Sequence, residues 1–473
     1  MISRRHFIVN TSALAAGAFL LPHVANSKES STELVKQCGP ASKYTPTMMA
    51  AFVRRKGEYG MRWPGQIYDG KAAFKKYHQQ ITKTAKNLNV NIQIRPEPIH
   101  SLEEADAWVA QATAQKPDGL MVITLDRQEH AWPTVNKAID SQIPTVVFSP
   151  LGTSFTTNTA APSQKEGVFI CSTDDFSQAA FGMKMIHAAA KLRETRFLII
   201  KGDERKESEI GHLGTKLQYV PARVFIAEYN NVQETPFIKK LAQDLILHAR
   251  HVHGPSKQDV INGVKSYLVA KNLLEREGCD GISMDCLGVL SDKNISLPCI
   301  AWSRMNDHAV PAACEADLEA CVTHALVQYL FDRPGFQQDP VAETAKECLI
   351  GSHCCCPTRL QGFAESSEPY EIVPHHGKRD ATAKPEWRIG QRITVADLLL
   401  KSEKNEMIIS AGEVVENKSV PPSGGCVVAP MVKLDNVNDV LDYPGFHQIF
   451  FYGDFKKELK SYCQLFGITP RIV

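Results

Sequence analysis

The sequence has almost no excess of charge of either sign, because its 53 lysines and arginines nearly balance its 52 aspartates and glutamates. It also lacks long runs of like charge and any strong internal repeat. Nucleic acids and anionic membranes attract proteins through a broad basic field, so this balance predicts neither as a partner. The length of 473 residues exceeds what one ordinary hydrophobic core organises and favours two or three domains.

Beyond the N-terminus, no segment is apolar enough to span a bilayer, so the mature chain is expected to be soluble. The N-terminal apolar stretch, residues 7–21, is short and follows Arg4-Arg5, and small residues follow it at 25–27. This arrangement resembles a twin-arginine signal peptide over residues 1–27; a mitochondrial presequence or a chance basic leader is the alternative. The twin-arginine route carries folded clients, so the resemblance implies a periplasmic or exported protein that is a metalloprotein or an assembled oligomer.

The 13 cysteines lack the even number and the dense, regular spacing of a small disulfide-stabilised scaffold. No CxxC pair completes the ligand spacing of a zinc ribbon. The run Cys354-Cys355-Cys356 is unusual, but three adjacent residues cannot easily bind one metal ion together. We therefore interpret these cysteines as buried thiols at the corner between a strand and a loop. Export leaves pairing among them open.

The pattern of residues 51–205 predicts an N-terminal α/β domain that follows a polar linker over residues 28–50. Apolar strands are expected at residues 89–95, 119–125, 143–148, 168–171 and 196–201, with helices between them. Continuous apolar strands that alternate with helices are typical of a parallel sheet that is covered on both faces.

The same alternation predicts a second α/β domain over residues 206–345, with strands at 224–227 and 281–284 and an amphipathic helix at 258–277. From residue 346 to residue 473 the pattern changes to short strands separated by Pro, Gly and Asn. These strands are expected at residues 347–350, 370–374, 407–411, 426–432 and 448–452, and a helix at 455–465 ends the chain. The predicted fold is two doubly wound parallel-sheet α/β domains followed by a β-rich, barrel-like C-terminal domain.

Five polar residues are candidates for chemistry, and each has a structural alternative. Asp285 ends a strand, where open parallel sheets bind ligands, but it also suits a turn. Glu315 and Asp317 begin a helix, where acids are favoured by the helix dipole, and they also suit a metal site. His353 and His447 each lie alone at a strand edge, where a hydrogen-bonded structural imidazole is the common case.

Four stretches together resemble the superfamily of L-fucose isomerase and L-arabinose isomerase. Three lie in the C-terminal half: Glu315-Ala316-Asp317, Gly351-Ser352-His353, and residues 445–454 with Gly467-Ile468. The fourth, residues 60–64 with Asp69-Gly70, is a weak match. The resemblance implies a metal-dependent aldose–ketose isomerase, an intramolecular oxidoreductase that forms trimers or hexamers.

The resemblance also implies roles for the candidate residues. Asp317, His447 and Asp285 would bind the metal, His353 would bind it or make a polar contact, and Glu315 would support the site from behind. Asp285 and Asp317 would be catalytic, although Asp285 stands where the family has a Glu that is one methylene longer. A divalent ion held by carboxylates and imidazoles stabilises the charge of an enediol, and Mn²⁺ suits such a set best, with Mg²⁺ next.

Two other functions remain open at this point. One is a non-catalytic periplasmic sugar-binding protein, and the other is an epimerase or lyase with the same metal site. The expected ligand is a monosaccharide in each case, and the expected assembly is a homo-oligomer. The sequence indicates neither nucleic acid as a partner nor a membrane once the signal is cleaved.

Overall fold

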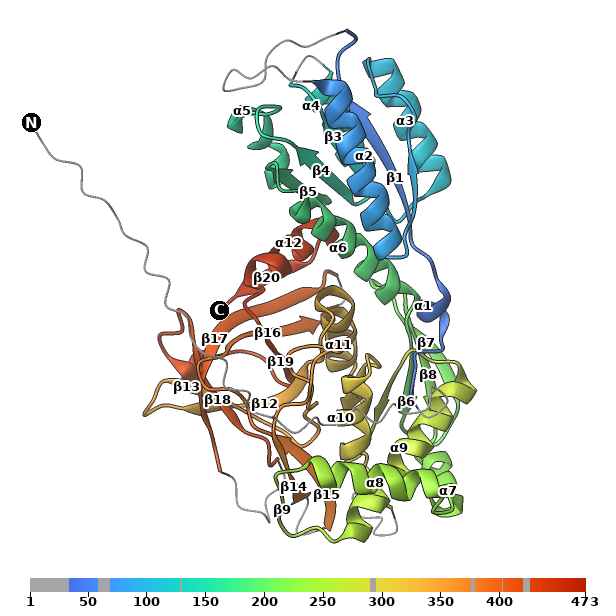
Figure 1. Cartoon of the computed structure of the whole chain (residues 1–473), viewed down its shortest axis with the longest axis vertical. Coiled ribbons are helices and arrows are strands. Elements are labelled where there is room, and N and C mark those ends of the chain that lie inside the picture. Colours follow the sequence, from blue (N-terminus) through green and yellow to red (C-terminus); the bar gives the residue numbers. More distant parts are fainter. Residues whose placement is uncertain are drawn as a thin grey trace, which may run out of the picture. The chain divides into compact units, whose positions relative to one another are not determined.

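The computed structural model describes residues 34–57, 69–127, 130–289, 295–375, 379–401, 403–419 and 426–473 (Figure 1). The predicted signal peptide, residues 1–27, and the weakly matching stretch 60–64 lie outside the described residues. Among the helices within these ranges, none combines the length and the apolar character needed to cross a bilayer.

The first sheet is wholly parallel, and its strand order is β2-β1-β3-β4-β5. Its strands are β1 (Thr47–Val53), β2 (Asn91–Ile94), β3 (Gly119–Thr124), β4 (Thr145–Ser149) and β5 (Val168–Ser172). The helices that follow these strands are α2 (Gly70–Asn87), α3 (Leu102–Gln115), α4 (Ala131–Asp140) and α6 (Phe176–Glu194), with the short α5 (Thr156–Thr159) and η1 (Pro162–Gln164). This confirms the predicted parallel sheet, and it adds β1, most of which falls inside the predicted linker.

Strand β1 shows why both faces of this sheet carry helices. Met48 and Phe52 belong to the core shared with α2 and α6, whereas Met49 and Val53 belong to the core shared with α3 and α4. Successive side chains of a strand point to opposite faces, so a strand that is apolar at every position is covered twice.

The second sheet has the strand order β11-β10-β6-β8-β7. Its parallel strands are β6 (Arg196–Ile200), β8 (Thr215–Val220), β10 (Gly281–Met284) and β11 (Ala312–Cys314), and β7 (Lys206–Ile210) is antiparallel. The helices here are α7 (Ala222–Asn231), α8 (Pro236–His248), α9 (Lys257–Glu277), α10 (Cys299–Asp307) and α11 (Leu318–Phe331). Strand order reverses between β6 and β10, and ligands of open α/β sheets bind beyond the carboxyl ends of the strands at such a point.

Two expectations for this region differ from the structure. The strand predicted at residues 224–227 lies within α7, where Phe225 and Tyr229 are buried on one face. A short apolar run has no period of its own, so packing decides between strand and helix. The strand at 196–200, assigned above to the first domain, belongs to the second sheet, because β6 pairs with β8 and β10.

The C-terminal part contains the expected barrel. Six antiparallel strands close on themselves in the order β16-β19-β12-β13-β18-β17, because β17 also pairs with β16. They are β12 (Phe336–Glu343), β13 (Cys348–Ser352), β16 (Arg392–Leu399), β17 (Glu406–Asn417), β18 (Pro430–Leu434) and β19 (Gln448–Tyr452). The remaining elements are α1 (Pro40–Lys43), β9 (His251–Val252), β14 (Tyr370–His375), β15 (Arg379–Pro385), η2 (Val440–Asp442), α12 (Lys456–Phe466) and β20 (Thr469–Ile472).

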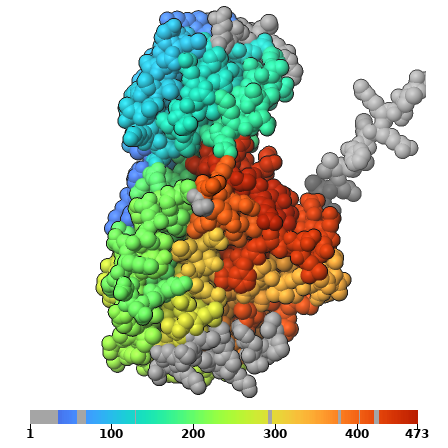
Figure 2. All heavy atoms as spheres, turned by 180° about the vertical axis from the view of Figure 1, so that it is seen from behind, coloured from blue at the N-terminus to red at the C-terminus, as the bar shows by residue number. Residues whose placement is uncertain are grey.

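The barrel packs against helix α11 of the second α/β part. The Leu398 amide donates to Thr323 Oγ1 at 2.9 Å, and the Leu400 amide donates to Glu319 Oε1 at 2.7 Å. The space-filling view shows the orange and red barrel in direct contact with yellow residues of that part (Figure 2). This contact brings the end of β11 close to barrel strands that are far away in the sequence.

Candidate functional site

The site begins where β11 ends and the chain turns into α11. Glu315 and Ala316 both adopt left-handed backbone conformations, with φ angles of 64° and 54°. Asp317 then caps the helix, and its Oδ1 accepts the Ala320 amide at 2.9 Å. Residues other than glycine hold this conformation at a cost of about 1–3 kcal/mol each, and such strain gathers at functional sites. The strained turn places the two acids on one side of the chain.

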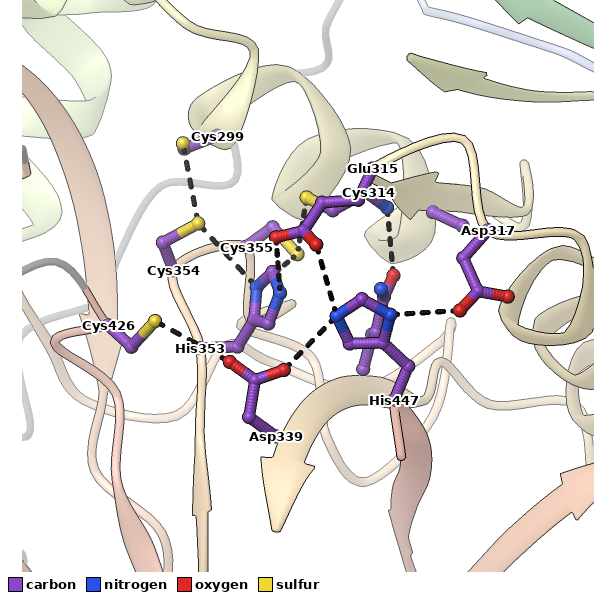
Figure 3. Close-up of polar contacts among 12 residues, drawn as sticks. Cys299, Cys314, Glu315, Asp317, Asp339, His353, Cys354, Cys355, Cys426 and His447 are labelled. Carbon is purple, nitrogen blue, oxygen red and sulfur yellow. Dashed lines mark hydrogen bonds and ion pairs between the residues drawn. The ribbon is translucent and has the colours of Figure 1, made fainter. Parts of the chain in front are cut away.

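His447 is the residue on which the acids converge. It precedes β19, has a φ angle of 55° and is 5% exposed. Its Nδ1 lies 2.8 Å from Asp317 Oδ2. Its Nε2 lies 3.1 Å from Asp339 Oδ1, on β12, and 3.4 Å from Glu315 Oε2. Three carboxylates therefore surround one buried imidazole (Figure 3).

His353 completes the group from the residues just after β13. It is 2% exposed, and its ring centroid lies 5.6 Å from that of His447. Its Nε2 lies 3.8 Å from Glu315 Oε1 and forms no hydrogen bond within the described part of the chain. The Glu315 carboxylate thus lies between two imidazoles, as the close-up view shows (Figure 3).

The electrostatics of the site follow from burial and from this pairing. Burial disfavours a charged imidazole at His447, but the hydrogen bonds with Asp317 and Asp339 outweigh it and raise the pKa of His447 to about 9. Burial likewise opposes the charge on Asp317, yet the bond with His447 leaves the pKa of Asp317 below its ordinary value. Burial is the largest effect on Glu315 and raises its pKa above the ordinary value. The two histidines lower this pKa, and repulsion from Asp339 raises it further.

Three of these side chains are close enough together to hold a metal ion. One ligand atom from each of Glu315, His353 and His447 lies within 4.8 Å of the other two. A buried His353 Nε2 without a hydrogen bond in the described residues is a donor atom that lacks a partner, which is what a metal ligand looks like before the ion binds. Carboxylate oxygens and imidazole nitrogens suit Mn²⁺, and Asp339 offers a further oxygen.

The structure places the predicted residues as follows. Asp317, His353 and His447 come together, and Glu315, expected behind the site, lies at its centre. Asp285 does not join them through any contact found in the described ranges: its Oδ1 accepts the Gly288 amide at 3.1 Å. The turn-forming alternative therefore describes its geometry.

The sequence reasoning missed Asp339. It lies on β12 directly after Gln337 and Gln338, both of which are fully buried. The signal available in the sequence was a run of three polar residues between Phe336 and Pro340, near the end of the expected second domain. Polar side chains at buried positions usually form hydrogen bonds with other residues or contact a ligand.

A hollow of about 590 Å³ lies next to the strained turn. Ala316 and Leu318 form part of its wall. The rest comes from Tyr219 of β8, from the first residue of β7, Lys206, and from the connection between β6 and β7, namely Lys201, Gly202, Asp203 and Glu204. The hollow lies beyond the carboxyl ends of β6 and β8, the edge at which open α/β sheets bind ligands.

Comparisons with known proteins give no family assignment. No family model matches the chain, and no curated protein matches it. Among solved structures, a sugar-binding protein of a sugar ABC transporter from Bacillus halodurans is 16% identical, covers 60% of this chain and 88% of its own, with a TM-score of 0.19.

Two further structures belong to the same kind of protein. An arabinose-binding protein from Geobacillus stearothermophilus is 14% identical and covers 54% of this chain and 80% of its own, with a TM-score of 0.19. A periplasmic solute-binding protein from Actinobacillus succinogenes with bound D-allose is 12% identical and covers 60% of this chain and 92% of its own, with a TM-score of 0.19.

These findings correct two expectations. The chain was expected to belong to the superfamily of L-fucose and L-arabinose isomerases and to be an intramolecular oxidoreductase. The three structures named above are a sugar-binding, an arabinose-binding and a solute-binding protein instead, and no family model or curated protein matches the chain. The geometry supplies a physical reason, since the expected acid–base residue Asp285 caps its own turn.

Proposed function

We propose that this protein is an exported, non-catalytic sugar-binding protein that holds a monosaccharide beside the cluster of Glu315, Asp317, Asp339, His353 and His447. The observation that carries the proposal is the convergence of three carboxylates on the buried His447. Carboxylate oxygens accept hydrogen bonds from neighbouring sugar hydroxyls, and imidazoles both donate and accept them. The three solved structures are sugar-binding proteins too, but the support for the proposal comes from the donor set.

We further propose that a divalent cation binds to Glu315, His353 and His447 and takes part in sugar binding. Mn²⁺ is the preferred ion. The ion would neutralise carboxylates that crowd together, and it would bind two sugar oxygens at its free positions. The residues of the chain would orient the sugar: Asp317 fixes the ring of His447 through the 2.8 Å bond, and Asp339 faces the other ring nitrogen.

Isothermal titration calorimetry tests both parts. The full mature chain is titrated with a panel of aldoses and ketoses, with Mn²⁺ and with EDTA. We expect at least one monosaccharide to bind, and binding to weaken in EDTA. Glu315→Gln should weaken Mn²⁺ binding by about 10–100-fold, because it removes the oxygen charge between the imidazoles. Glu413→Gln, an exposed change on β17, is the matched control and should leave binding unchanged.

The outcomes are distinct. If no sugar of the panel binds with or without Mn²⁺, the proposed function is wrong. If a sugar binds equally well to the wild type and to Glu315→Gln, the site lies elsewhere. Sugar turnover by the wild type would contradict the non-catalytic assignment.

The twin-arginine route is part of the same proposal. Replacing Arg4-Arg5 with Lys-Lys should retain the protein in the cytoplasm of a bacterial host, because that pathway reads the arginine pair. Cell fractionation measures it, and a periplasmic location of the variant would contradict the route. Size-exclusion chromatography with light scattering tests the proposed homo-oligomer on the same samples.

A further inference from the structure

Behind His353 lies a second cluster, built from four cysteines and two histidines, all of them buried. Cys299 begins α10, Cys314 ends β11, Cys354 and Cys355 follow β13, and His375 ends β14. All of these thiols are free in the structure. Four separate parts of the fold thus contribute soft donor atoms to one buried cluster.

The cluster divides into two sets of three ligands. Cys299 Sγ lies 3.6 Å from Cys354 Sγ and 3.9 Å from His375 Nδ1. Cys314 Sγ lies 3.3 Å from Cys355 Sγ, and Cys355 Sγ lies 3.5 Å from His353 Nδ1. The adjacent residues Cys354 and Cys355 contact different cysteines, Cys299 and Cys314, although both thiols also lie 3.5 Å from His353 Nδ1 (Figure 3). Each can therefore bind an ion with its own cysteine partner, so the two adjacent residues need not share one ion.

The spacing of the donor atoms matches that of a metal site. Zn–S bonds of about 2.3 Å and Zn–N bonds of about 2.0–2.1 Å at tetrahedral angles put sulfur atoms about 3.8 Å apart and sulfur and nitrogen about 3.5 Å apart. A disulfide needs about 2.05 Å between its sulfur atoms, so neither pair is bonded as it stands. One ligand atom from each member of a set lies within 4.8 Å of the other two.

We infer that each ligand set of this cysteine–histidine cluster binds a thiophilic d¹⁰ metal ion, Zn²⁺ or Cu⁺. Cys299, Cys354 and His375 form one set, and Cys314, Cys355 and His353 form the other. Two thiolates and an imidazole select these ions over Mn²⁺ or Mg²⁺. The two thiols of each set lose their protons when the ion binds, and His353 releases its ring proton as well when both of its nitrogens bind ions. His353 Nδ1 faces these thiols while its Nε2 faces Glu315, so this histidine adjoins both the soft cluster and the carboxylate site.

The test uses the full mature chain, purified without chelator under anaerobic conditions. Metal content is measured by mass spectrometry after incubation with Zn²⁺, or with Cu⁺ buffered by a chromophoric chelator, followed by gel filtration. We expect Zn²⁺ or Cu⁺ to bind to the wild type and to protect the cluster thiols from a thiol reagent. Cys354→Ala/Cys355→Ala should lose at least about tenfold in affinity, since it removes one ligand from each set. Cys463→Ala, a buried thiol in contact with Met407, is the matched control and should bind normally.

X-ray absorption of the wild-type complex keeps the inference testable if the double variant fails to fold. Sulfur and nitrogen neighbours at bonding distance support the site, whereas oxygen neighbours alone refute it. Equal binding by the wild type and by a folded double variant also refutes it. So does a protein whose four cluster thiols are found as disulfides and which takes up neither ion. Glu315→Gln should keep the thiophilic ion, which separates this inference from the proposed sugar site.

Discussion

The buried carboxyl group of Asp397 gives the sharpest test of the electrostatics around the site. It lies on β16 and is 1% exposed, and neither of its oxygens has a hydrogen-bond partner within the described residues. Burial, followed by repulsion from Glu319 and Asp317, raises the pKa of Asp397 to about 7 from an ordinary value of 3.8. We therefore predict that Asp397→Asn stabilises the protein at neutral and higher pH.

The sign and the size follow from proton linkage. The folded protein keeps this proton up to about pH 7, whereas the unfolded chain releases it near pH 4, so the free energy of unfolding falls as the pH rises between these values. One pKa unit corresponds to about 1.4 kcal/mol, so a shift of about three units costs at most about 4 kcal/mol above pH 7. The neutral amide of Asn has a similar size and carries no such cost. The difference between variant and wild type should be near zero at about pH 4 and should grow to a few kcal/mol above pH 7.

Urea denaturation followed by circular dichroism measures this difference at several pH values, with EDTA present so that no cation neutralises the site. Glu413→Gln, which removes an exposed charge from the same barrel, should show no such growth with pH. A variant that is less stable than the wild type, or a difference that does not change with pH, would refute the reasoning.

Three further predictions concern single side chains in and around the site. Asp307→Ala should lower the free energy of unfolding by about 3 kcal/mol in urea titrations, because the carboxylate accepts the Thr358 and Arg359 amides at 2.8 and 2.7 Å in a buried place; an unchanged midpoint would count against it. Asp317→Asn should lower the pKa of His447 from about 9 in a metal-free NMR titration, since the carboxylate that favours the imidazolium is gone; a constant pKa would contradict the pairing. Gly445→Ala should lower the melting temperature, at a cost of about 1–3 kcal/mol, because φ is 90° and the new Cβ would lie 2.5 Å from Gln448 Nε2; a melting curve like that of the wild type would disprove this strain.

The sequence predicted the secondary structure best where burial leaves a strong mark. Strands β3, β4 and β10 are continuous apolar runs, and the structure confirms each of them. The run at residues 224–227 was misassigned, because four apolar residues fit one face of a helix as well as a strand. The barrel was predicted from the spacing of short strands, but its closure depends on the pairing of β16 with β17, which local patterns do not specify.

The candidate site was predictable only in part. Asp317 was predicted as an acid at a helix start, and His353 and His447 were predicted as histidines at strand edges. Each of these patterns is the same in the sequence when the residue has only a structural role. Asp285 was chosen for its place at a strand end, and its side chain serves a turn instead. Asp339 went unnoticed, and the run Cys354-Cys355-Cys356 was interpreted as buried thiols, because the ligand character of these residues arises from neighbours on other elements.

By itself the amino-acid order determined which segments are apolar, where helices and strands alternate, and which side chains are able to bind a cation. Tertiary structure alone decided which of those side chains meet. Asp339, His353 and His447 come together because β12 pairs with β13 and with β19, and Glu315 reaches them from the end of β11 in the second sheet. The physical reason is one of range. Burial patterns act on each segment locally, whereas an interaction between an imidazole and a carboxylate needs atoms within about 4 Å, and such distances are set by the packing of whole elements.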